Sequence, residues 1–163
     1  MGQYYMVVNI DKKEYLHPHR FDDGLKLMEF GQSAGGTLTG LAILLADGNG
    51  GGGGDIYSED PIIGSWAGDR IVIAGDYAEP RNFLTEEEII EYQKKYREEE
   101  GEDRQRYIED NTNLYSVCNT FYKDISREVV RVLVEAKEFS EERIEGIKRM
   151  CEYMKREVPE YLE

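Results

Sequence analysis

The chain has 163 residues, a formal net charge of -14 at neutral pH and 40% hydrophobic residues. A chain of this length can bury a core without disulfide or metal staples, so we expect residues 1–163 to form one domain. The excess of acidic residues argues against a basic face for phosphate backbones, and we expect no direct nucleic-acid binding.

Two further features concern the cellular environment. No apolar run approaches the length of a membrane span, and the N-terminus lacks the basic start and apolar stretch of a signal peptide. Cys118 and Cys151 form neither a disulfide framework nor a metal-ligand spacing, which predicts buried thiols. We therefore expect a soluble, cytoplasmic protein without membrane association.

The first half of the chain predicts strands and one short helix. Residues 4–10 and 14–17 are rich in aromatic and β-branched residues at hairpin distance, which predicts an N-terminal β-hairpin. Apolar residues spaced by three and four predict a buried helix over 37–46. Residues 70–74 have the composition of a strand that ends at a Gly-Asp pair.

A helix start is clear after residue 84. Thr85 and Glu88 form a capping box, in which the hydroxyl and the carboxylate satisfy free backbone N–H groups. We expect an amphipathic, peripheral helix over 86–99, followed by a charged, solvated stretch over 98–106.

The remaining segments differ in how clearly they can be predicted. Residues 113–122 fit a strand or an irregular packed segment, and periodicity does not separate the two. Residues 125–136 fit a helix face, although their valines also suit a strand. Ser140 as a cap and an apolar stripe predict a C-terminal helix over 140–158.

Strands therefore come early and helices late. This order predicts an α+β fold with a small, mainly antiparallel sheet from the N-terminal half, packed with helices, and a mostly helical C-terminal half. Residues 1–84 form the strand-rich part with a glycine-rich loop, and residues 85–163 form the helix-rich part.

The glycine-rich loop is the most unusual segment of the chain. Five consecutive glycines lie between Asn49 and Asp55, and ordering them costs about 0.5–1 kcal/mol per residue relative to alanine. The apolar segment with the single tryptophan, Trp66, follows soon after, so we expect packing directly beyond the loop. The run matches a dinucleotide fingerprint only formally, because the strand and the helix stand in reversed order. No Walker phosphate loop is present, and an EF-hand loop would lack two ligands.

Cation or ligand binding remains as a broader hypothesis for this loop. Oxygen-bearing side chains are dense in it and flexible glycines let them converge, although a merely solvated acidic loop is the alternative. The candidate ligands of a divalent cation are Asp47, Asn49, Asp55 and Asp69. The candidate cofactor-binding residues are Gly50, Gly52 and Arg70.

Two other groups of residues carry weaker signals. His17 and His19 flank a proline and form either a metal pair without an evident third ligand or a turn next to an edge strand. Asp69 and Arg70 begin a strand, where they act either as a general base with an anion clamp or as members of structural ion pairs. No serine or cysteine lies in a nucleophile elbow, so no catalytic residue is predicted.

Several segments of the first half resemble one family as a set. They are GQYY (residues 2–5), VVNIDKKEYLHPHRF (7–21), GLKLMEF (24–30), GNGGGGGD (48–55), GSWAGDR (64–70) and GDYAE (75–79). The set resembles a family of small uncharacterised proteins of bacteria, archaea and their viruses with a GNGRGGGD-like loop. The resemblance implies kinship and names no activity, cofactor or catalytic residue. This chain has Gly51 where the family pattern has arginine, which puts an anion site in the loop in doubt.

Two function classes follow. The first is an intracellular protein that binds a small ligand or a divalent cation through the acidic glycine-rich loop. The second is a non-enzymatic interaction module or inhibitor, such as a nucleic-acid mimic, that presents acidic helices 85–100 and 140–158 to a basic protein partner.

Overall fold

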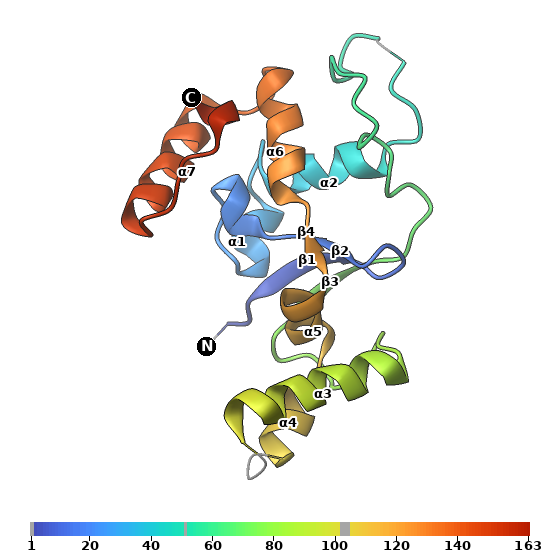
Figure 1. Ribbon diagram of the computed structural model, residues 1–163. Coiled ribbons are helices and arrows are strands. Elements are labelled where there is room, and N and C mark those ends of the chain that lie inside the picture. The colour runs from blue at the N-terminus through green and yellow to red at the C-terminus, as the bar shows by residue number, and fades with distance from the viewer. Residues whose placement is uncertain (1, 51, 102–104) are drawn as a thin grey trace.

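A computed structural model describes residues 2–50, 52–101 and 105–163 (Figure 1). Gly51 and part of the charged stretch 98–106 lie outside these residues. The sheet of the described chain has the order β3-β1-β2-β4. Its strands are β1 (Tyr5–Asn9), β2 (Glu14–Leu16), β3 (Ile71–Gly75) and β4 (Lys123–Asp124). β1 pairs antiparallel with both β2 and β3, whereas β4 joins β2 in parallel.

Helices cover both faces of this sheet. The helices are α1 (Leu27–Gly31), α2 (Thr37–Leu45), α3 (Glu86–Glu100), α4 (Gln105–Asn111), α5 (Leu114–Phe121), α6 (Ser126–Glu135) and α7 (Glu141–Tyr153), with 3-10 turns η1 (Pro18–Phe21) and η3 (Glu160–Leu162). Figure 1 shows α1, α2, α6 and α7 on one side of the sheet and α3, α4 and α5 on the other. The predicted α+β class is confirmed, because the sheet comes mainly from the N-terminal half and most helices from the C-terminal half.

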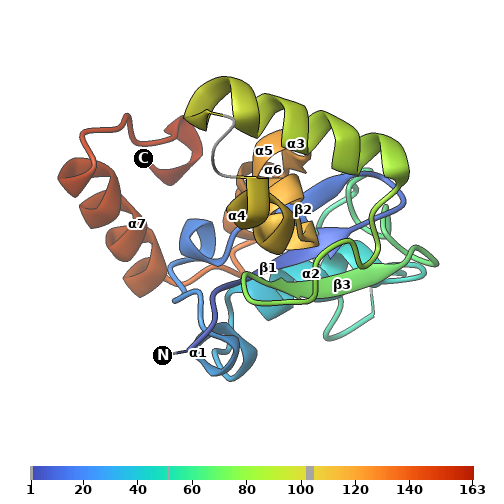
Figure 2. The ribbon, with the colours of Figure 1, turned by 90° about the horizontal axis from the view of Figure 1, so that it is seen from below.

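Successive side chains of β1 point to opposite faces of the sheet and belong to two separate hydrophobic cores. Val7 packs on one face with α2, α6 and α7, whereas Met6 and Val8 pack on the other face against α5. Figure 2 views the sheet from below and shows β2, β1 and β3 side by side. Helices α5 and α6 of the second half thus pack on the early sheet. No helix in the described ranges combines the length and the apolar character that crossing a bilayer requires.

Most predicted elements are confirmed within one or two residues. The structure contains the predicted hairpin, the predicted helix 37–46 as α2, the predicted strand as β3 and the predicted helix 125–136 as α6. The capping box is also present, since the Thr85 hydroxyl accepts the Glu88 N–H and the Glu88 carboxylate accepts the Thr85 N–H. Ser140 caps α7 by accepting the Arg143 N–H.

Two predictions need correction. Residues 113–122 are neither a strand nor irregular: Asn113 caps helix α5, whose apolar residues face the β1 core. Helix α7 ends at Tyr153 and not at residue 158. Lys155 adopts a left-handed backbone with φ 54°, and the Arg156 N–H donates to the Cys151 carbonyl, which is a Schellman stop without its usual glycine.

A buried ion pair fixes α7 against the first half of the chain. The Asp23 carboxylate is 1% exposed and accepts an Arg143 guanidinium N–H at 2.8 Å. The same carboxylate accepts the backbone N–H and the hydroxyl of Thr37 at the start of α2. Arg143 also donates to the carbonyls of Phe21 and Ala34. One contact therefore joins η1, α2 and α7.

The segment beyond the glycine-rich loop terminates α2. The N–H groups of Gly64 and Trp66 donate to the carbonyls of Ile43 and Leu44, which are free at the helix end. Trp66 is fully buried, and its indole N–H donates to Glu14 at 2.9 Å. The predicted packing beyond the loop is confirmed.

The need for glycine at the end of α2 can be tested by comparing alanine substitutions at Gly64 and Gly50. Gly64 has φ +77°, and a Cβ there would lie 2.5 Å from the Ala46 carbonyl oxygen. Because left-handed backbone costs a non-glycine residue about 1–2 kcal/mol and the clash adds to it, Gly64→Ala should lower the free energy of unfolding by about 2 kcal/mol or more. Urea denaturation followed by Trp66 fluorescence measures this change.

Gly50→Ala is the matched control, because a Cβ at Gly50 would meet open space. It should change stability by no more than about 0.5–1 kcal/mol. Equal losses of unfolding free energy in the two variants would contradict the conclusion that the end of α2 requires glycine at position 64.

Candidate functional site

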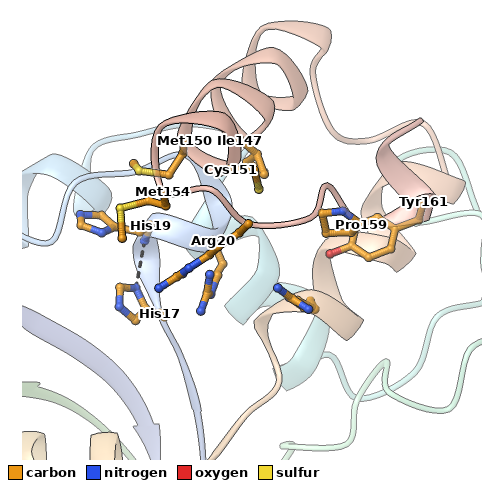
Figure 3. Close-up of a pocket in the computed structure, with 11 residues that line it drawn as sticks. His17, His19, Arg20, Ile147, Met150, Cys151, Met154, Pro159 and Tyr161 are labelled. Atoms are coloured by element: carbon orange, nitrogen blue, oxygen red, sulfur yellow. Dashed lines mark hydrogen bonds between the residues drawn. The ribbon is translucent and has the colours of Figure 1, made fainter.

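A cavity of about 320 Å³ lies between η1, α6, α7 and the turn η3 (Figure 3). It is lined by His17, His19, Arg20, Arg127, Ile147, Met150, Cys151, Met154, Arg156, Pro159 and Tyr161. Among the residues that the structure describes, three arginines and two histidines line it and no carboxylate does. A concentration of positive charge in a chain of net charge -14 marks this cavity as distinct from the rest of the surface.

The cavity has an apolar wall as well as a charged one. Ile147 and Cys151 of α7 are buried, whereas Met150 and Met154 are partly exposed at the same helix face. Figure 3 shows the methionines on the side of His19, with Pro159 and Tyr161 at the opposite end. Such a combination of apolar wall and few polar groups is typical of small-molecule pockets.

His17 occupies the start of η1 and has a fixed orientation. Its backbone N–H donates to the Ser126 hydroxyl at 2.8 Å, which ties η1 to the first residue of α6. Its Nδ1 accepts the His19 N–H at 3.3 Å. A neutral imidazole with Nδ1 as acceptor carries its proton on Nε2, which is then a hydrogen-bond donor.

Burial keeps this imidazole neutral. Desolvation lowers the pKa of His17 to about 4, and the positive charges of His19, Arg20 and Arg156 act in the same direction against the opposing effect of Asp124. The pKa of His19 is also lowered, mainly by desolvation and then by Arg20. At neutral pH the histidines thus contribute donors without charge, and the arginines supply the charge.

The three arginines differ in their existing partners. Arg20 lies 3.6 Å from Asp124, a long ion pair at a side chain that is 35% exposed. In the described part of the chain, neither Arg127 nor Arg156 has a carboxylate within 4.0 Å. The Schellman turn at the end of α7 brings Arg156 back to the cavity. Two guanidinium groups are therefore available for an anion.

The predicted residues of the glycine-rich loop lie elsewhere. Asn49 and Asp55 line a second cavity of about 290 Å³ beside α2. Asn49 is used within the loop, because its amide donates to the carbonyls of Ile56 and Ser58 while its oxygen accepts the Ile56 N–H. Asp55 accepts the Gly52 N–H. These contacts hold the loop to itself.

Asp69 and Arg70 are ion-pair members at the tip of the β1–β2 hairpin. Asp69 accepts from Lys12 at 2.6 Å and from the Asn9 amide at 2.9 Å. Arg70 donates two N–H groups to Asp11. Both pairs lower the pKa of their carboxyl groups, Asp11 through Arg70 and Asp69 through Lys12. The structure thus gives these two residues hairpin partners and not loop partners.

The other predicted residues, Asp47, Gly50 and Gly52, are exposed on the loop. Among the described residues, no cluster of three or more His, Cys, Asp or Glu side chains has the arrangement of a metal centre. The divalent-cation hypothesis for Asp47, Asn49, Asp55 and Asp69 stays a prediction.

Sequence analysis identified the histidines but not their neighbours. Arg127 and Arg156 lie within the predicted helices 125–136 and 140–158, where charged residues are ordinary. The available signal was the stripe itself: Ile147, Cys151 and Met154 continue toward a turn that carries arginine, proline and tyrosine. Only the folding back of residues 155–162 makes that turn a cavity wall.

Comparison with protein-family models, with curated proteins and with solved structures finds no match. The resemblance of the first half to a family of uncharacterised proteins therefore stays a prediction.

The lowered pKa of His17 has a measurable consequence for stability. Between about pH 6.5 and pH 4 the unfolded chain binds a proton at His17 that the folded chain does not, so the free energy of unfolding should fall as the pH is lowered through this window. His17→Gln should make that fall shallower. Urea denaturation at a series of pH values measures the slope.

His19→Gln is the matched comparison, because His19 is more exposed and should contribute less to the slope. The shifted carboxyl groups of Asp11, Asp60 and Asp69 act mainly below this window, since their pKa values lie under the usual value of 3.8. An unchanged slope in His17→Gln would contradict the burial of a neutral imidazole at this position.

Proposed function

We propose that this protein binds a small organic anion in the cavity between η1 and α7. The single observation that carries the proposal is that Arg20, Arg127 and Arg156 line one cavity to which the described part of the chain contributes no carboxylate. Guanidinium groups bind carboxylates and phosphates through paired, charge-assisted hydrogen bonds. A bound anion would replace the carboxylate partners that Arg127 and Arg156 lack in the described chain.

The ligand has a polar end and an apolar part. Its phosphate or carboxylate would lie against the arginines and accept a hydrogen bond from His17 Nε2. Its apolar part would contact Ile147, Met150 and Met154. The volume of about 320 Å³ lies at the small end of the range for ligand pockets, which favours a metabolite-sized molecule over a peptide or a dinucleotide.

The convergence of cationic side chains on one cavity is expected to disfavour the folded state. Like charges that line one cavity repel one another, and an anion would relieve this repulsion. A ligand that binds only the folded chain must also raise its melting temperature.

Phenyl phosphate is a suitable probe, because it joins a phosphate to an aromatic ring. At ten times its dissociation constant it should stabilise the fold by about 1.4 kcal/mol, which raises the melting temperature by about 3–6 °C for a chain of this size. Benzylamine, a cation of similar shape, should give no shift. Isothermal titration calorimetry then gives the affinity.

Arg127→Gln and Arg156→Gln should each weaken phenyl phosphate binding by about 10- to 100-fold, the usual worth of a charge-assisted hydrogen bond. Arg106→Gln, which alters an exposed arginine on α4, should leave the affinity unchanged. A stabilising effect of calcium or magnesium with none from phenyl phosphate would reject the anion site and favour the glycine-rich loop.

A further inference from the structure

The positive charges around the cationic cavity come from three separate elements of the fold. Arg20 belongs to η1, Arg127 to α6 and Arg156 to the turn that follows α7. The lining residues that α7 itself contributes carry no charge. The cavity therefore has charged groups on the sides of η1, α6 and the turn, and an uncharged wall along α7.

Arg20 lies at the centre of this set of charges. Desolvation is the main cause that lowers the pKa of His17, and the charges of Arg20 and Arg156 act in the same direction. At the other end of the cavity, burial raises the pKa of Tyr161, whereas Arg127 and Arg20 act to lower it. Figure 3 shows Arg20 between His17 and Tyr161. The three guanidinium groups thus act on one shared space.

The charge balance of this space is positive by about two units. Arg20 is partly compensated by Asp124, whose carboxylate lies 3.6 Å away. Within the described residues, Arg127 and Arg156 have no carboxylate within 4.0 Å. Three guanidinium groups beside one carboxylate leave the charge of two guanidinium groups without compensation.

The other titratable groups nearby leave this balance unchanged at neutral pH. Desolvation lowers the pKa of His17 to about 4 and also lowers the pKa of His19, so both imidazoles are neutral. Glu128 acts on Tyr161, but it pairs with Lys123 at 3.8 Å and does not line the cavity. The histidines therefore add hydrogen-bond donors to the site without adding charge.

Among common organic anions, a phosphate monoester fits such a site best. It carries about 1.5 to 2 negative charges at pH 7, because its second pKa is about 6, and it presents three strong acceptor oxygens. A carboxylate carries one charge on two oxygens, and a sulfate ester or a phosphate diester also carries one charge. Building on the proposed anion site, we infer that its ligand is the phosphate monoester of a small, partly apolar molecule, bound as the dianion.

The uncharged wall along α7 favours a ligand with one charged end. Ile147, Met150 and Met154 offer a surface for the ester group. A molecule with anionic groups at both ends would place one of them against this wall, away from the guanidinium groups. Leaving a charge desolvated without a partner is costly, so the two charges of the ligand belong on one group.

Phenyl phosphate and phenyl sulfate form the primary test, because they have nearly the same shape and differ in charge. Isothermal titration calorimetry at about pH 7.5, above the second pKa of the phosphate, should show phenyl phosphate binding at least about tenfold more tightly. Phenylmalonate, which carries two carboxylates on one carbon, should also bind more weakly than phenyl phosphate.

Arginine variants test the origin of this preference. Arg156→Gln removes one uncompensated positive charge, and a dianion loses more attraction than a monoanion does. The ratio of the phenyl phosphate and phenyl sulfate affinities should therefore fall at least about threefold. Arg106→Gln, on the exposed surface of α4, should leave the ratio unchanged. Equal melting temperatures of the variants without ligand confirm that both are folded.

The outcomes separate this inference from the proposed function on which it rests. Equal affinities for phenyl phosphate and phenyl sulfate would overturn the dianion assignment and leave the anion site in place. Tighter binding of phenylmalonate would overturn the phosphate monoester in favour of a dicarboxylate. Binding of none of the three would reject the anion site itself, and with it the inference. These results come from the unaltered chain and do not depend on whether a variant folds.

Discussion

The buried ion pair between Asp23 and Arg143 is the contact on which the arrangement of this protein depends. Asp23 accepts a hydrogen bond from Thr37 of α2 and one from Arg143 of α7, and Arg143 also donates to the Phe21 carbonyl of η1. Removing one member of such a pair leaves an unpaired buried charge and typically costs about 3–5 kcal/mol. That loss is a large part of the 5–15 kcal/mol by which domains are stable. Close approach is possible because Gly146 of α7 lies against Asp22, where a Cβ would lie only 2.3 Å from a carboxylate oxygen.

The position of α7 then determines the cationic cavity. Residues of α7 form the apolar wall, and the turn after it returns Arg156 toward the histidines of η1. Because the chain has a net charge of -14, its overall field repels free anions and slows their encounter with the cavity. Added salt should weaken this repulsion and the arginine contacts together. Affinity in such a site depends on close guanidinium contacts, because long-range attraction is absent.

Local signals in the sequence account for most of the fold. Capping residues such as Thr85 and Ser140 act through neighbours three positions away, so the starts of α3 and α7 could be predicted. The end of α7 could not, because Lys155 adopts a conformation that usually marks glycine. Helix α5 carries a helical spacing of apolar residues, but its valine, tyrosine and phenylalanine also suit a strand. Its identity depends on packing against β1.

The candidate site was less predictable for a similar reason. The glycine-rich loop stands out as a local pattern, but its side chains bond within the loop, and the segment beyond it terminates α2. The cavity joins residues near positions 17, 127 and 156, which no local pattern links. Their charge did not identify them as site residues. Whether an arginine can bind an anion depends on whether a carboxylate already pairs with it in the fold, and the sequence does not show this. His17 was identified from its spacing, but its neutral state follows from burial.

The most direct test uses the fact that the chain has only two histidines, both of which line the cavity. Imidazole NMR resonances of His17 and His19 can be followed while phenyl phosphate is added and the pH is varied. The account predicts that both histidines shift on binding and that the pKa of His17 rises from about 4, because a nearby anion favours the charged imidazolium. Binding of phenyl phosphate without any change at either histidine would contradict it.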